Sequence, residues 1–170
     1  MKLIGPDSSF YLTILGYQHP DAAGEPYDAN WLSIHIEAVG PDPLHPGRKG
    51  AWTGTDPCLL TYEVGWLADW LQAIGGSASR NGNPPAPAIS FLEPVLLFRV
   101  VEIGEHRLLR VHFGNLINPS WRVFSGERPH TSPDLWLDFP LDQAGLAGVA
   151  SAGTELREEV RRYPDRAKDR

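Results

Sequence analysis

Two segments near the start of the chain carry apolar side chains at every second position, and this alternation limits what the sequence can fold into. The segments are residues 10–14 and 31–39. Their apolar positions are Phe10, Leu12, Ile14, Leu32, Ile34, Ile36 and Ala38. A period of two is typical of a half-buried β-strand, because successive side chains point to opposite faces. Residues 18–29 between them contain Pro20, Gly24 and Pro26 and predict a loop. The sequence therefore predicts strand, loop, strand, with the even positions in the core.

A helix is predicted to run from Thr61 to the Gly75-Gly76 pair. Its apolar side chains, spaced three and four residues apart, are Val64, Leu67, Leu71 and Ile74. This spacing places them on one helical face, and Trp66 and Trp70 are expected to widen that face. Thr61 is the expected N-cap, and Glu63 lies in the first turn, where the helix dipole favours a negative charge. The glycine pair predicts the C-terminal end.

A second helix is predicted over at least residues 154–163, from apolar positions spaced in the same way. Gly145, Gly148 and Gly153 lie in or before it. Each glycine costs a helix about 1 kcal/mol relative to alanine, so we expect the first half to bend or break. Residues 165–170 are expected to be a frayed C-terminal tail.

The remaining apolar runs predict more strands. They lie at residues 49–55, 89–93, 95–103, 108–113, 121–124 and 134–139. Most links between strands are too short for the crossover that parallel pairing requires. The predicted fold class is therefore α+β, with a mainly antiparallel β-sheet or sandwich packed against two helices. Residues 1–170 are predicted to form a single domain.

Composition excludes several classes of protein. Hydrophobic residues make up 42% of the chain and charged residues 21%, as in an ordinary globular domain. No apolar run reaches the roughly 18 residues that cross a bilayer, and the first residues lack the apolar stretch of a signal peptide. A cytoplasmic location is therefore expected. Cys58 is the only cysteine, which excludes an internal disulfide and a thiolate zinc cluster.

The net charge of −6 is unevenly distributed, because residues 1–75 hold nine acidic and three basic residues. This acidity argues against nucleic-acid binding, which normally requires a basic patch. It suits a basic protein partner attracted by complementary charge. Solubility alone is the simpler explanation of a charge of this size.

The loop at residues 18–29 is the candidate partner-binding site. Its acidic and aromatic side chains include Asp21, Glu25, Tyr27 and Asp28. Loops between well-patterned strands can vary in chemistry without unfolding the scaffold. We therefore expect this loop to be exposed and these four residues to contribute to partner binding.

No local catalytic signature is present, and neither a cofactor nor a metal site is predicted. The sequence lacks an HExxH, a GxSxG, a phosphate-binding loop and a dinucleotide fingerprint. His35 and Glu37 fall on the same side of a predicted strand, and the fold could bring His112 to them, which would be enough for zinc. A surface pair without catalysis is the alternative.

Three tryptophans also leave two explanations open. Trp31, Trp52 and Trp136 are expected opposite the aliphatic side of their strands. They could pack between layers of the structure. They could instead form a partner surface, where indoles are preferred anchors.

Several short motifs resemble, in their order, the WapI-type family of small bacterial immunity proteins. They are Leu-Gly-Tyr-Gln-His-Pro at 15–20, Tyr-Asp-Ala-Asn-Trp-Leu at 27–32, the Trp52 strand leading into the Thr61 helix, and Glu-Leu-Arg-Glu-Glu-Val-Arg-Arg-Tyr-Pro at 155–164. The resemblance spans about residues 10–164. The Pro-rich segments 40–47 and 83–87 depart from it.

The resemblance implies a non-catalytic cytoplasmic protein that binds and neutralises the toxic domain of a contact-dependent, wall-associated toxin. It implies a protein partner, which the acidic loop suggests is basic, and neither nucleic acid nor membrane. The family supplies no functional residues to transfer to this chain. The alternative function is a small-ligand-binding domain, with an aromatic pocket between the sheet and the Thr61 helix.

Overall fold

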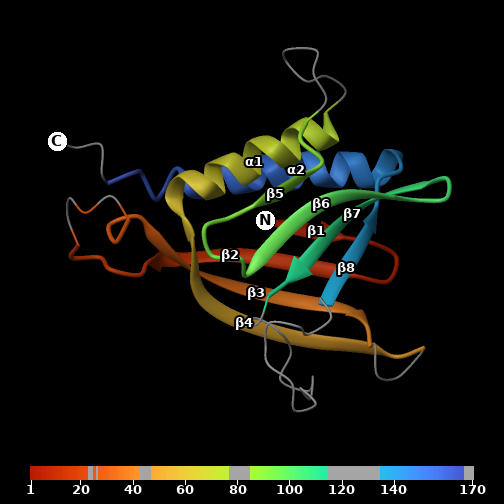
Figure 1. Ribbon diagram of the computed structural model, residues 1–170, viewed down its shortest axis with the longest axis horizontal. Helices are drawn as coiled ribbons and strands as arrows, with labels where there is room; N and C mark the ends of the chain where they lie inside the picture. The colour runs from red at the N-terminus through yellow and green to blue at the C-terminus, as the bar shows by residue number, and fades with distance from the viewer. Residues whose placement is uncertain (23–24, 26, 43–46, 77–84, 115–134, 167–170) are drawn as a thin grey trace.

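The computed structural model describes residues 1–22, 25, 27–42, 47–76, 85–114 and 135–166. They form two four-stranded antiparallel sheets and two helices (Figure 1). The first sheet has the order β1 (Lys2–Ile4), β2 (Ser9–Tyr17), β3 (Trp31–Pro41) and β4 (Lys49–Leu60). The second has the order β5 (Ala88–Ser90), β6 (Leu96–Ile103), β7 (His106–Phe113) and β8 (Leu135–Pro140). The helices are α1 (Thr61–Gly75) and α2 (Gln143–Val160). The predicted α+β class is confirmed.

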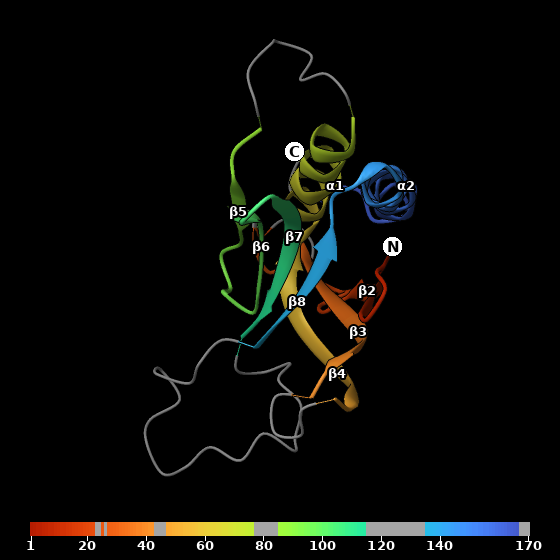
Figure 2. The same ribbon diagram turned by 90° about the vertical axis from the view of Figure 1, so that its right-hand side faces the viewer.

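The core lies between the two sheets and beneath the helix pair. Phe10 of the first sheet contacts Phe98 and Phe113 of the second, with ring centroids 6.0 and 5.6 Å apart. Trp52 packs edge-on against Phe113 at 5.3 Å. Figure 2 shows α1 and α2 side by side, together on one side of the sheets. Within the described part of the chain, neither helix is long and apolar enough to cross a membrane.

The alternating segments behave as their period predicts. Every even position of residues 10–14 and 32–38 is buried, and the two strands pair as β2 and β3. The α1 stripe is also confirmed, since Val64, Leu67 and Leu71 are fully buried and Ile74 nearly so. These elements were predictable because a local period alone decides which side chains share a face.

Three details of the predicted elements are wrong. Thr61 is the first residue of α1 and not its N-cap, which is Leu60. The Glu63 carboxylate instead accepts a hydrogen bond from the Leu60 amide at 2.9 Å. Trp66 does not widen the buried face, because its side chain is 56% exposed. The strand around Trp52 extends to Leu60, since β4 pairs with β3 along its whole length. The predicted strand at 121–124 lies outside the described residues.

Contrary to expectation, α2 is continuous through its glycines, and one of them, Gly153, lets it approach α1 closely. A Cβ atom added to Gly153 would lie 2.8 Å from the Ala68 carbonyl oxygen and 2.9 Å from the Gln72 nitrogen. On α1, a Cβ added to Gly75 would lie 2.5 Å from the Ala150 nitrogen. All three distances end on backbone atoms, which cannot rotate away. The missing side chains therefore let the two helix backbones meet.

This contact predicts opposite effects of the same substitution at two sites in α2. Gly153→Ala should lower the free energy of unfolding by about 1–3 kcal/mol, because overpacking outweighs the gain in helix propensity. Gly148 is exposed, and an added Cβ there meets nothing within 4 Å. Gly148→Ala should therefore raise the free energy of unfolding by up to about 1 kcal/mol. Urea unfolding of both variants measures the difference. Equal effects would show that the helices do not depend on this contact.

Candidate functional site

The segment between β2 and β3 is an exposed acidic loop, as predicted. The side chains of Asp21, Glu25, Tyr27 and Asp28 are all exposed, that of Tyr27 by 58%. Backbone hydrogen bonds shape the second half of the loop, where the Asn30 amide donates to the Tyr27 carbonyl at 2.9 Å. The loop thus presents these four side chains to solvent. Their contribution to partner binding stays a prediction.

Asp21 and Asp28 line the same open depression, of about 360 Å³. Its other lining residues are Gln18, His19, Pro20 and Ala22. The two carboxylates come from opposite ends of the loop, so the loop conformation, and not the sequence spacing, brings them together. Within the described part of the chain, neither carboxylate makes a salt bridge.

Arg166 holds the acidic loop from outside it. Its guanidinium donates hydrogen bonds to the carbonyls of Pro20 at 2.6 Å, His19 at 3.1 Å and Ala29 at 3.5 Å. The guanidinium also lies over the Tyr17 ring, 4.6 Å from its centroid. One cation therefore satisfies backbone acceptors at both ends of the loop, which favours a single loop conformation.

Asn30 is the second anchor of the loop, and it is only 1% exposed. Its side-chain NH2 group donates to the Asp165 carboxylate at 2.8 Å, and its side-chain oxygen accepts from the backbone amide of Arg166 at 2.9 Å. Its carbonyl accepts from the Thr61 amide at 3.1 Å. Asn30 therefore joins the end of the loop to the start of α1 and to the C-terminal segment. Asp165 and Arg166 belong to the segment that was expected to fray, and these bonds tie both to the loop, whereas residues 167–170 lie outside the described residues.

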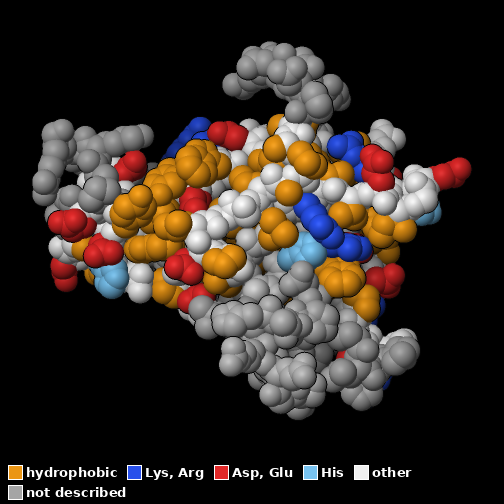
Figure 3. Space-filling view, viewed as in Figure 1, with side chains coloured by type: hydrophobic (Ala, Val, Ile, Leu, Met, Phe, Trp, Pro, Cys, Tyr) orange, Lys and Arg blue, Asp and Glu red, His pale blue; other side chains and the backbone are white. Residues whose placement is uncertain are grey.

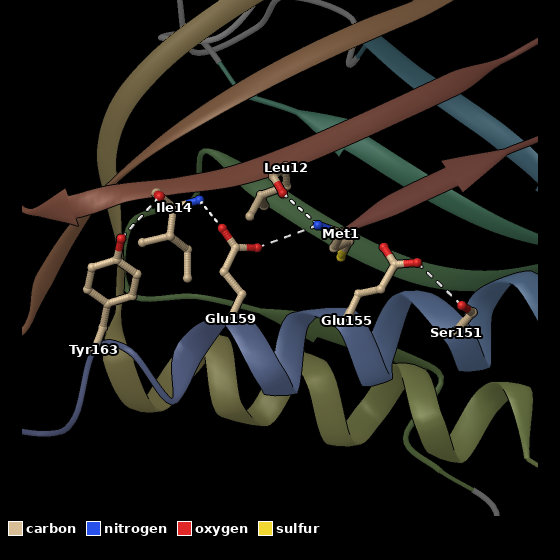
Figure 4. Close-up of polar contacts among 7 residues, drawn as sticks. All are labelled: Met1, Leu12, Ile14, Ser151, Glu155, Glu159 and Tyr163. Carbon is tan, nitrogen blue, oxygen red and sulfur yellow. Dashed lines mark hydrogen bonds and ion pairs between the residues drawn. The ribbon is translucent and has the colours of Figure 1, made fainter.

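The end of β2 that leads into the loop is fixed by α2 and the residues after it (Figure 4). Glu159 accepts a hydrogen bond from the Ile14 amide at 2.8 Å, and its other oxygen lies 3.6 Å from the Met1 ammonium group. The Tyr163 hydroxyl donates to the Ile14 carbonyl at 3.4 Å. Side chains thus replace the strand partner that β1 does not supply beyond Leu12. Tyr17 adds a hydrogen bond of 2.5 Å to the Pro164 carbonyl.

The structure does not bring His112 to His35 and Glu37, the arrangement that the sequence left open. His35 and Glu37 form a loose pair on the outer side of β3, with 4.0 Å between Nε2 and Oε1. His35 also bonds Thr55 at 2.9 Å. His112 is buried on β7 in the other sheet. Among the described residues, no group of three His, Cys, Asp or Glu side chains is arranged to hold a metal ion.

Cys58 is buried. Burial raises the pKa of its thiol to about 12, and the negative charges of Asp56, Glu63 and Glu93 add to the shift. The thiol is therefore protonated at neutral pH, and this form is a poor nucleophile.

The three tryptophans considered from the sequence differ in burial, and Trp31 of β3 is half-buried. Trp52 lies in the core, against Phe113. Trp136 is 43% exposed on the outer face of the second sheet, where Arg110 lies 4.6 Å from its ring centroid. Arg110 is itself held by Asp138 through two hydrogen bonds of 2.7 Å.

A depression of about 360 Å³ reaches α1. It is lined by Ile74, Pro85, Pro87, Val100, Glu102 and Arg107, with no indole among them. A third depression, on the outer side of β2, β3 and β4, includes Trp52, which is otherwise buried.

Comparison with models of known protein families places the chain in one of them. The model of the Immunity protein WapI-like family matches residues 2–164. The chain belongs to the WapI-like immunity protein family. This confirms the resemblance, which the match extends to the first strand. No curated protein matches the sequence.

Among solved structures, one described as the structure of the plant transcriptional regulator PBF-2 aligns with 96% of this chain and 82% of its own. The sequence identity is 8% and the TM-score 0.38. A likeness this weak supports no argument about the fold or function of this WapI-like protein.

The loop of this WapI-like protein should depend on Arg166. Arg166→Ala removes three hydrogen bonds to loop carbonyls. The free energy of unfolding should fall by about 1–2 kcal/mol, and the amide hydrogens of His19, Asp21 and Ala22 should exchange faster. Arg162→Ala is the matched control, because that side chain is exposed and makes no hydrogen bond to a described residue. If both variants behaved alike, Arg166 would not be the anchor.

Proposed function

We propose that this protein is a non-catalytic immunity module, which binds the toxic domain of a contact-dependent, wall-associated toxin and neutralises it. The observation that carries the proposal is the family match over residues 2–164. An immunity protein acts by stoichiometric binding, so it requires a stable recognition surface and no cofactor. We place this activity in the cytoplasm, with no role for nucleic acid or membrane.

We further propose that the acidic loop contributes to toxin binding. Asp21, Glu25 and Asp28 are exposed and form no salt bridge within the described part of the chain, so they are available to basic groups of a partner. The bonds from Arg166 and Asn30 support the loop before binding. A preorganised loop binds more tightly, since less conformational entropy is lost on association.

Charge reversal tests the role of the loop. The proposed function predicts a large secreted repeat protein encoded upstream of this gene, and the purified C-terminal domain of that protein is the ligand in the test. The triple variant Asp21→Lys, Glu25→Lys, Asp28→Lys should raise the Kd by about tenfold or more and weaken its dependence on salt, because the attraction between complementary charges is lost. Calorimetry at several salt concentrations measures both effects.

The control reverses three exposed acids away from the loop, Glu102, Glu105 and Glu158, and so changes the net charge by the same amount. It should alter the Kd far less. If both triple variants lost the same affinity, long-range charge and not the loop would be responsible. If the unmodified protein neither bound the domain nor protected cells that express it, the proposed immunity function would be wrong.

A further inference from the structure

A second surface, made of three aromatic side chains and one leucine, lies beside the acidic loop. It consists of Tyr62 and Trp66 on α1, Tyr27 of the loop and Leu92 after β5, and we call it the α1 patch. Trp66, Tyr27 and Leu92 are 56%, 58% and 59% exposed. Figure 3 shows hydrophobic side chains gathered over the first half of α1, with acidic side chains around them. Large exposed aromatic groups are unusual on a helix that already buries its opposite face.

Several contacts hold the parts of the α1 patch together. The Tyr62 and Trp66 rings are 4.9 Å apart, one helical turn from each other. The Leu92 amide donates to the Glu63 carboxylate at 2.7 Å, which fixes Leu92 beside the first turn of α1. Tyr27 is tied to the same turn through Asn30, whose carbonyl accepts from Thr61. The patch is therefore built on rigid elements and is continuous with the acidic loop.

Negative charge surrounds the α1 patch. Asp28 follows Tyr27, and Glu93 follows Leu92. The pKa of Asp56 is raised by burial and, to a smaller extent, by the nearby negative charge of Glu93. In the described part of the chain, none of these three carboxylates forms a salt bridge. A positive group placed beside Asp56 and Glu93 would relieve the repulsion between these two carboxylates.

We propose that the α1 patch is the docking surface for a basic face of the toxin domain, with Trp66 and Tyr62 as its anchors. This inference rests on the proposed immunity function and names the surface and the chemistry that it recognises. Lysine or arginine side chains of the partner lie over the aromatic rings, where cations are attracted to the ring face, and pair with Asp28, Asp56 and Glu93 at the rim. Aromatic anchors inside a charged rim are the usual form of a specific interface.

Charge also decides against a second copy of this chain as the occupant. Two α1 patches facing each other would bring both acidic rims together, and like charges across an interface oppose association. A partner with an excess of lysine and arginine meets no such repulsion.

Binding of the same purified toxin domain to single-site variants tests the α1 patch. Trp66→Ala and Tyr62→Ala should each raise the Kd at least tenfold, as expected for interface anchors. The matched controls are Trp136→Ala and Tyr11→Ala, which remove side chains 43% and 39% exposed outside the patch. They should change the Kd less than twofold. Urea midpoints within error of the unmodified protein show that each variant is folded. Sedimentation of the unmodified protein alone should give a monomer.

The possible results distinguish an error in the proposed docking surface from an error in the proposed immunity function. If the unmodified protein bound the domain and Trp66→Ala did not weaken binding, the docking surface would be wrong while the immunity function stood. If the unmodified protein did not bind, both would fall. A dimer that Trp66→Ala converts to a monomer would assign the patch to self-association and overturn the proposal.

Discussion

The close contact between α1 and α2 determines where the other functional parts of the molecule lie. Gly75 and Gly153 let the two backbones approach within a distance that any side chain would prevent. With α2 held there, Glu159 and Tyr163 reach β2, and the residues that follow reach the acidic loop. The same contact leaves the opposite face of α1 uncovered, with Trp66 and Tyr62 upon it.

Buried polar bonds then convert this packing into a defined loop. Asn30 is almost fully buried, so leaving its amide unpaired would be costly. Its bonds to Asp165 and Arg166 therefore tie the loop to the C-terminal segment, 135 residues or more along the chain. Such long-range bonds restrict the loop without filling its outer surface, so the acidic side chains stay available to a partner.

The distribution of charge suits a binding protein of the WapI-like family. Acidic residues predominate in the first half of the chain, and the fold places several of them around the loop and the first turn of α1. Basic side chains such as Arg166, Arg157 and Arg110 are already occupied by carbonyls or carboxylates of the chain itself. Several exposed acidic side chains that form no salt bridge within the described residues thus lie around the loop, beside the exposed ring of Trp66.

The sequence by itself determined the elements and the exposure of the acidic loop, because hydrophobic periods and loop residues act over a few neighbours. The burial of Phe10, Leu12 and Ile14 and of the α1 stripe follows from such periods. The position of Trp66 outside the buried stripe could also have been predicted from the sequence. At about 100° per residue, Trp66 lies about 120° around the helix from the centre of the stripe. Only the tertiary structure decided that Gly153 is a contact point, that Arg166 supports the loop, and that His35 and His112 lie on different sheets. These outcomes depend on residues far apart in the chain, which no local pattern can bring together.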